Sequence, residues 1–174
     1  MHLTHSVPPP PEFGAPLPIS ASPEVVNFLA LRRSASAATL RPPAPTSEEL
    51  RTLLRLAARA PDHGKLNPWR FVVLDGAGKA AFVEGLEQIA AERPDAQKAL
   101  AKLFKIRTPP LTVAVVSRAS DGGDIPEWEQ LLSAGAVCTL LTIAAQAMGY
   151  GANWITDWYA YDERVKAQIG RAHV

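Results

Sequence analysis

The pattern of apolar and polar positions predicts a chain made mostly of helices. Thr46 and Glu49 form a capping box, and leucines and an alanine follow at helical spacing as far as Ala57. Ser22, followed by Pro23 and an acid, marks an earlier helix start. Further helices are predicted over residues 79–91, 95–105, 127–148 and 162–169.

Three short apolar runs between these helices predict strands over residues 71–74, 111–116 and 150–155. The resulting order is helices, strand, helices, strand, one long apolar helix and a last strand. This order is typical of an α+β domain in which the long hydrophobic helix packs on a small sheet.

At 174 residues the chain is long enough for one domain with a real core. Proline is concentrated in residues 1–21, which we expect to form an extended or disordered leader ahead of a single domain over 22–174. The 18 basic residues nearly cancel the 17 acidic ones, so no overall charge attracts nucleic acid or a membrane.

The stretch from Leu131 to Thr156 contains no charged side chain. Polar residues and glycines interrupt it, which favours a core helix plus a strand over a membrane span. Cys138 is the single cysteine, so an internal disulfide is impossible and a buried thiol in a cytoplasmic protein is expected.

The motif Arg32-Arg33-Ser34 has three interpretations. Two arginines at a helix C-terminus complement the helix dipole without any function. Alternatively, their guanidinium groups and the hydroxyl bind a phosphate. Nucleic-acid binding is weaker, because no basic stripe accompanies the motif.

The loop from Arg59 to Trp69 carries Asp62, His63, Lys65 and Asn67 within six positions. In one interpretation the acid caps a turn, the lysine is solvated and Trp69 enters the core. In the other, His63 and Lys65 donate to a ring carbonyl or a phosphate, and a cation near a flavin stabilises the charge of reduction.

The glycine-rich segment from Gly149 to Thr156 is either a helix C-cap leading into a strand or a wall for a planar ring. No metal site is expected, because His2, His5, His63 and His173 show no ligand spacing.

These motifs in this order resemble the nitroreductase family of flavin enzymes, and its short bacterial branch in particular. The resemblance covers roughly residues 24–170 and includes Trp128-Glu129-Gln130 and Ser133-Ala134-Gly135. It implies a nitroreductase-like fold with a small mixed or antiparallel sheet around a long central helix.

The resemblance also implies a homodimer with FMN at the interface. Hydride would pass from NAD(P)H through FMN N5 to a nitroaromatic, a quinone or a similar acceptor in ping-pong order, with no catalytic protein residue. The implied FMN-binding residues are Arg32, Arg33, Ser34, Arg59, His63, Lys65, Asn67, Trp154, Ile155 and Thr156. Arg59 and His63 would reach FMN from the partner subunit.

Two departures from the family pattern keep other functions open. Members typically continue with a strand of the form Val-Ala-Gly-Phe-Ile-x-x-Gly, whereas this chain stops at Val174, so we expect a shortened form that lacks the final strand. Trp154-Ile155-Thr156 stands where relatives carry Trp-Arg-Ser. A flavin-binding protein without turnover and an inactive remnant are the alternatives.

Overall fold

Two antiparallel strands form the one sheet in the part of the chain that the structure describes. β1 (Trp69–Leu74) pairs with β2 (Thr112–Ser117), with Trp69 opposite Ser117 and Leu74 opposite Thr112. The structure is a computed structural model, and it describes residues 7–17, 19–120 and 123–171. Both strands lie where the apolar runs predict them.

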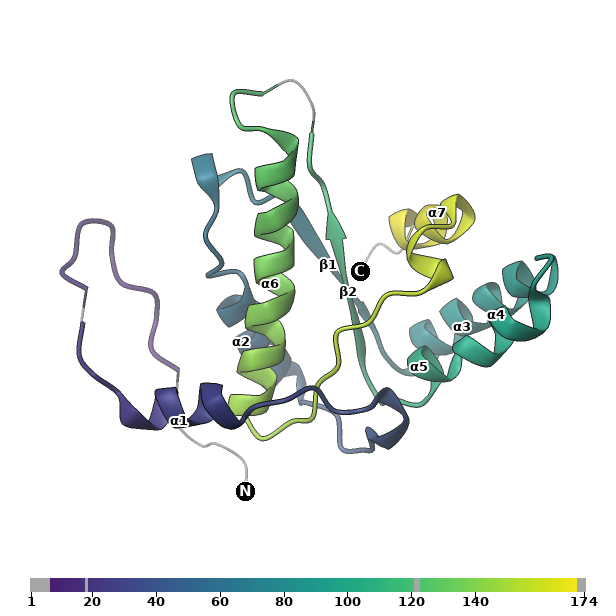
Figure 1. The fold of residues 1–174 in the computed structure, drawn as a ribbon, viewed down its shortest axis with the longest axis horizontal. Coiled ribbons are helices and arrows are strands. Elements are labelled where there is room, and N and C mark those ends of the chain that lie inside the picture. The colour runs from purple at the N-terminus through teal and green to yellow at the C-terminus, as the bar shows by residue number, and fades with distance from the viewer. Residues whose placement is uncertain (1–6, 18, 121–122, 172–174) are drawn as a thin grey trace.

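Helices surround this sheet (Figure 1). Their order confirms the α+β class: α1 (Pro23–Leu31), α2 (Ser47–Ala57), α3 (Gly76–Ala91), α4 (Ala96–Lys102), α5 (Phe104–Arg107), α6 (Glu127–Ala147) and α7 (Glu163–Arg171). Short 3₁₀ turns η1 (Ala37–Thr39), η2 (His63–Lys65) and η3 (Trp158–Ala160) lie between them. The helix predicted over 95–105 is divided at Leu103 into α4 and α5.

The two faces of the sheet are covered by different helices. Trp69, Phe71 and Val115 pack with α2 and α6 in one apolar cluster. Arg70 points to the other face, where its guanidinium donates to the backbone oxygen of Ile169 in α7 at 3.2 Å. On that side Leu86 of α3, Leu103 between α4 and α5, and side chains of α5, η3 and α7 form a second cluster. The alternation of side chains along β1 therefore places the sheet between two helical layers.

Local signals set the start of two helices as the sequence predicts. The Thr46 hydroxyl accepts from the Glu49 backbone at 3.3 Å, and the Glu49 carboxylate accepts from the Thr46 backbone at 2.8 Å, so the capping box of α2 is complete. α1 begins at Pro23, directly after Ser22, but the Ser22 hydroxyl makes no capping bond to the helix backbone and donates to the Glu24 carboxylate at 3.3 Å instead.

α6 is the central helix of the fold. It packs against α2 and β2 and contributes Ala134, Val137 and Ala144 to the apolar clusters. By length and composition it is apolar enough to cross a membrane. A core helix of a globular domain meets the same criterion, and its contacts with α2 and the sheet agree with that role.

Residues 150–155 do not form the strand that their composition predicts. They run as extended chain after α6, and two backbone hydrogen bonds join them to other segments. Ala35 donates to the oxygen of Ala152 at 2.9 Å, and Tyr150 donates to the oxygen of Ala145 in α6 at 2.9 Å. The Asn153 amide adds a bond to the oxygen of Ala35. A strand needs a ladder of such bonds, and a cavity separates this segment from β2.

The leader contains no helix or strand over residues 7–17. Arg55 of α2 donates to the backbone oxygens of Val7 and Pro8 at 3.0 and 2.9 Å. The ammonium of Lys65 lies 4.9 Å from the ring centre of Phe13.

Candidate functional site

Seven of the ten residues predicted to bind FMN lie near the two ends of α6. At its C-terminal end lie Arg32, Arg33 and Ser34, a group we call the arginine end. At its N-terminal end lies the segment from Arg59 to Asn67, which we call the histidine loop. Figure 1 shows α1 meeting the lower end of α6 and the blue segment of η2 beside its upper half.

The arginine end is held by one glutamine of α6. The Nε of Arg32 donates to Oε1 of Gln146 at 2.9 Å, and Nε2 of Gln146 donates to the backbone oxygen of Arg33 at 2.5 Å. Arg33 and Ser34 are exposed. The glutamine fixes the chain as it leaves α1, and the outer guanidinium nitrogens of Arg32 have no recorded partner in the described chain.

The histidine loop is fastened to the first two turns of α6. Nδ1 of His63 lies 2.8 Å from Oε2 of Glu129, and the Ser133 hydroxyl donates to the backbone oxygen of Pro61 at 2.5 Å. Within the loop, the backbone N–H of Asn67 donates to the Asp62 carboxylate at 2.8 Å. These contacts leave Nε2 of His63 as the ring nitrogen that faces no recorded partner.

The backbone of the histidine loop is strained. Lys65 and Asn67 have φ of 54° and 49°, in the left-handed region that side chains other than glycine rarely adopt. Gly64, which lies between His63 and Lys65, has a φ of 74°. Strain of this kind persists only where the surroundings impose it, and it is common at binding sites.

A cavity of about 360 Å³ opens beside this strained turn. Arg59, Lys65 and Asn67 line it together with Asp62, and Trp69 of β1 closes it. The structure thus brings three of the predicted residues around one cavity. The sequence interpretation in which Trp69 enters the core is also correct, because its side chain belongs to the apolar cluster with Ala57 and Val137.

The predicted cations are available for an anion. Arg32, Arg33, Arg59 and Lys65 pair with no carboxylate in the part of the chain that the structure describes. Unpaired cations near one another attract phosphate and stabilise negative charge on a bound ring. Both ends of α6 therefore fit the chemistry of a flavin nucleotide.

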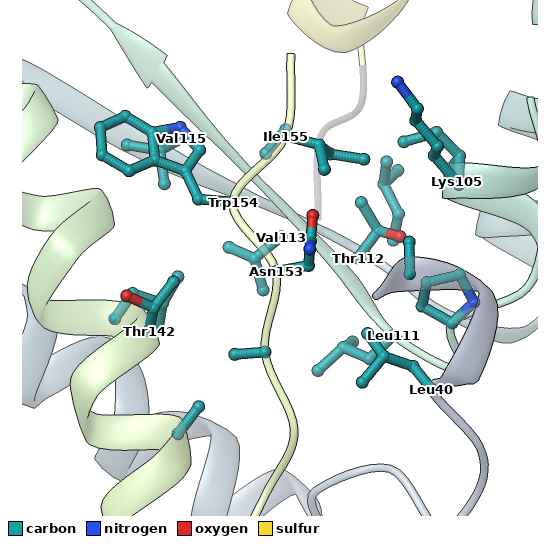
Figure 2. Close-up of a pocket in the computed structure, with 18 of the residues that line it drawn as sticks. Leu40, Lys105, Leu111, Thr112, Val113, Val115, Thr142, Asn153, Trp154 and Ile155 are labelled. Carbon is teal, nitrogen blue, oxygen red and sulfur yellow. The ribbon is translucent and has the colours of Figure 1, made fainter. Parts of the chain in front are cut away.

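The third predicted element is the extended segment after α6. Trp154 is 53% exposed, and a Cβ on Gly135 of α6 would lie 3.9 Å from its indole ring. Ile155 packs instead against the cluster of α3, α5 and α7, and Thr156 is exposed. Figure 2 shows Trp154 and Ile155 pointing in opposite directions, so Trp154 and Thr156 share one side of the segment.

An ion pair lies at the C-terminal end of this segment. Nζ of Lys105 lies 2.7 Å from the carboxylate of Asp157, which also accepts from the Trp158 backbone at 2.9 Å. Burial raises the pKa of Asp157, but the Lys105 and backbone hydrogen bonds outweigh it and the pKa is lowered. Cys138 is half-buried rather than fully buried as predicted, and this partial burial raises the pKa of its thiol.

Among the described residues no group of three metal-binding side chains is present. His2, His5 and His173 lie outside these residues.

The polar residues of α6 that hold both ends were not predicted as part of the site. The sequence does contain a signal for them, because polar side chains interrupt an otherwise apolar helix at Glu129, Ser133 and Gln146. Their partners lie 66, 72 and 114 positions away in the chain, so sequence spacing alone does not reveal them.

Comparison with known proteins places the chain in a family. The model of the nitroreductase family matches residues 29–172. "Putative NAD(P)H nitroreductase YdjA" of Escherichia coli (strain K12) is 40% identical over 133 residues, which is 75% of this chain and 71% of that protein. The chain therefore belongs to the nitroreductase family and is an oxidoreductase of that type.

Solved structures agree on the fold. A nitroreductase-like protein from Bacillus cereus superposes with a TM-score of 0.73 at 22% identity, covering 87% of this chain and 80% of that one. The FMN-dependent nitroreductase NfnB of Mycobacterium smegmatis, solved with NADPH, gives 0.66 at 16% identity and covers 84% and 80%. The nitroreductase-like fold expected from the sequence is confirmed.

Proposed function

We propose that this protein is an FMN-dependent NAD(P)H oxidoreductase whose two FMN sites are each shared between two copies of the chain. The relatives' names support the cofactor and the reductant. The main observation in support of a shared site is that the arginine end and the histidine loop lie at opposite ends of α6.

α6 gives the distance between them. Glu129, which holds His63, and Gln146, which holds Arg32, are separated by about 17 residues of helix, or roughly 25 Å at 1.5 Å per residue. That exceeds the length of an extended flavin mononucleotide. A single chain therefore does not bring both ends onto one FMN, whereas a two-fold axis across α6 pairs each arginine end with the partner's histidine loop.

The exposed side of α6 supports such a pairing. Trp128 and Leu132 are 62% and 64% exposed, and Leu131 beside them is also exposed. On α1, Val26 and Leu31 are exposed as well. Apolar surface of this extent on a central helix is typical of a face that a second subunit covers.

In the proposed site each group of residues has a separate task. Arg32, Arg33 and Ser34 bind the phosphate, the two guanidinium groups as charged donors and the serine as a short hydroxyl donor. The partner's Arg59, His63, Lys65 and Asn67 contact the ring, where the cations stabilise negative charge on its pyrimidine edge. Trp154 and Thr156 shield the ring from water.

FMN, when bound, supplies hydride transfer between NAD(P)H and a small acceptor in ping-pong order. The protein's task is to bind, orient and stabilise, so no side chain is assigned a proton-transfer role. The acceptor class we propose is a nitroaromatic, a quinone or a similar small molecule.

The first experiment is an absorbance spectrum of the purified protein, with chromatography of the flavin released on denaturation. We expect a flavin band with about one FMN per chain and bleaching by NADH or NADPH under nitrogen. A yellow protein that neither reductant bleaches is a flavin-binding protein without turnover. A folded protein that takes up no added FMN refutes the proposal.

A further inference from the structure

The ring chemistry of His63 depends on a side chain of α6. Nδ1 of His63 lies 2.8 Å from Oε2 of Glu129, the third residue of that helix. A neutral imidazole carries one proton, on either nitrogen, so one nitrogen donates a hydrogen bond and the other accepts one. Which nitrogen holds the proton is set by the bond that its ring partner makes. The partner of Nδ1 therefore decides what Nε2 can offer to a ligand.

Glu129 is suited to accept a hydrogen bond from His63. Its carboxylate belongs to the first turn of α6, where the positive end of the helix dipole favours negative charge. An ionised carboxylate has no proton to give and can only accept. The contact therefore places the proton of the neutral His63 ring on Nδ1, and Nε2 keeps a lone pair.

The backbone around His63 is held on both sides, which keeps the ring beside the carboxylate. Pairs between exposed side chains are normally weak, and the two side chains here are 65% and 29% exposed. On one side of His63, however, the Ser133 hydroxyl donates to the backbone oxygen of Pro61 at 2.5 Å. On the other side, a Cβ on Gly64 would lie 3.2 Å from the side chain of Ile125. The loop thus packs against α6 and against the chain that leads into it.

The chain that leads into α6 is fixed in turn by a buried glutamine. Gln130 is 3% exposed. Its Nε2 donates to the backbone oxygens of Ser120 and Ile125 at 3.0 and 2.9 Å, and its Oε1 accepts from the Ser120 backbone at 3.1 Å. A buried amide with all three bonds in place is costly to disturb. Gln130 follows Glu129 directly, so the carboxylate that contacts His63 starts from a rigid part of the helix.

The other side chains of the histidine loop offer donors. Arg59 and Lys65 line the cavity beside the strained turn, and both side chains can only donate. Nε2 of His63 has no recorded partner among the described residues and can accept. A ligand edge that carries both carbonyl oxygens and an N–H matches this combination. The pyrimidine edge of a flavin has this pattern, with one N–H, at N3, between two carbonyl groups.

We propose that Glu129 is a positioning residue that keeps the proton of neutral His63 on Nδ1, so that Nε2 accepts the N3–H of the flavin. This inference rests on the proposed FMN site. It assigns the neutral ring of His63 the opposite polarity to a donor for a ring carbonyl. Donation to the two carbonyl groups is left to the cations of the same loop.

The first test reads the ring nitrogens of His63 by NMR in the ligand-free, ¹⁵N-labelled chain. The measurement uses the carbon-bound ring protons at about pH 9, where histidine is ordinarily neutral, and His63→Asn identifies the signals among the four histidines. We expect the proton on Nδ1. Glu129→Ala and Glu129→Gln should shift both nitrogen signals toward those of a mixture of tautomers, because neither side chain can only accept.

Glu127→Ala is the matched control. Glu127 lies in the same turn, is exposed and has no recorded contact with His63, so the signals should not change. Circular dichroism checks that each variant is folded. A proton on Nε2 in the parent protein overturns the proposal, and so do ring signals that neither substitution of Glu129 changes.

The second test compares FMN with FMN methylated at N3, which has no N–H at that position. Flavin fluorescence gives the ratio of the two dissociation constants. The methylated nucleotide should bind the parent at least about tenfold more weakly, as expected when a hydrogen bond is lost and its acceptor stays unsatisfied. The bulk of the methyl group is the same for every variant, so the change in the ratio reports the hydrogen bond.

In Glu129→Gln this ratio should fall about threefold or more, and in Glu127→Gln it should equal that of the parent. A ratio that Glu129→Gln leaves unchanged overturns the proposal. Failure of the FMN proposal gives a different result: neither nucleotide binds the parent, which excludes the flavin as the partner of Nε2, while the NMR signals still show where the proton of His63 lies.

Discussion

The shared FMN site makes a quantitative prediction for mixtures of two defective variants. Arg33→Ala disables the arginine end of its own chain, and His63→Ala disables the histidine loop. Because about 25 Å of α6 separates the two groups, each site takes its arginine end from one chain and its loop from the other. In a mixed dimer one site then carries both substitutions, and the second site carries none.

The expected recovery follows from two-fold symmetry. Random assortment of equal amounts gives about half mixed dimers, and each mixed dimer has one intact site of two. About a quarter of all sites should therefore bind FMN with parental affinity, although neither variant does so alone. If each site were built within a single chain, every chain in the mixture would carry a defect and no intact site would form.

The assay is co-expression of the two variants with different affinity tags, followed by purification on both tags. Bound FMN per chain is measured by absorbance, and NAD(P)H bleaching reports the intact fraction. In the doubly purified mixed dimer about half of the sites should be filled. A mixed dimer that binds no more FMN than the two parent variants would refute the shared site, as would a monomer that binds FMN fully.

Three further predictions test separate parts of the structure. Arg32→Ala should weaken FMN binding by about 1.5–3 kcal/mol, as expected for a charge-assisted bond, while Arg51→Ala, an exposed arginine of α2, should change nothing in an FMN titration. Leu132→Glu places a charge on the exposed face of α6 and should shift the protein toward monomers in sedimentation velocity. The control Leu100→Glu, on α4 at a side chain that is 37% exposed, should not. A dimer unaffected by Leu132→Glu would disprove a dimer interface on α6. The pKa of Asp157 is lowered because the hydrogen bonds from Lys105 and the Trp158 backbone outweigh the effect of burial. The ionised Asp157 carboxylate therefore stabilises the fold above its ordinary pKa of about 3.9, and this stabilisation is lost as the pH falls through the lowered pKa of the folded protein. Asp157→Asn should therefore reduce the difference in unfolding free energy between pH 6 and pH 3 in urea titrations, and an unchanged difference would show that this carboxylate does not contribute.

Elements with local signals could be predicted from the sequence, and contacts between distant segments could not. The capping box of Thr46 and Glu49 involves residues three positions apart, and it forms as predicted. The apolar runs predicted β1 and β2 for the same reason. The run over residues 150–155 has the composition of a strand, but a strand also requires a partner edge. Only two isolated backbone bonds, one with Ala35 and one with Ala145, join the run to other segments.

The same distinction applies to the candidate site. The types of residue at the arginine end and in the histidine loop were evident from their motifs. Their arrangement depends on Glu129 and Gln146 of α6, whose partners lie far away in the sequence. The left-handed backbone of Lys65 has no sequence signal either, whereas Asn67 is a residue type that tolerates this conformation.

The central helix also restricts how this chain can change in length over evolution. One residue inserted in α6 between Glu129 and Gln146 would turn one end relative to the other by about 100° and shift it by about 1.5 Å. The His63 and Arg32 contacts would then no longer lie on the same sides of the helix. Insertions and deletions in descendants of this gene should therefore be found in the connections between elements, while the spacing between Glu129 and Gln146 stays constant.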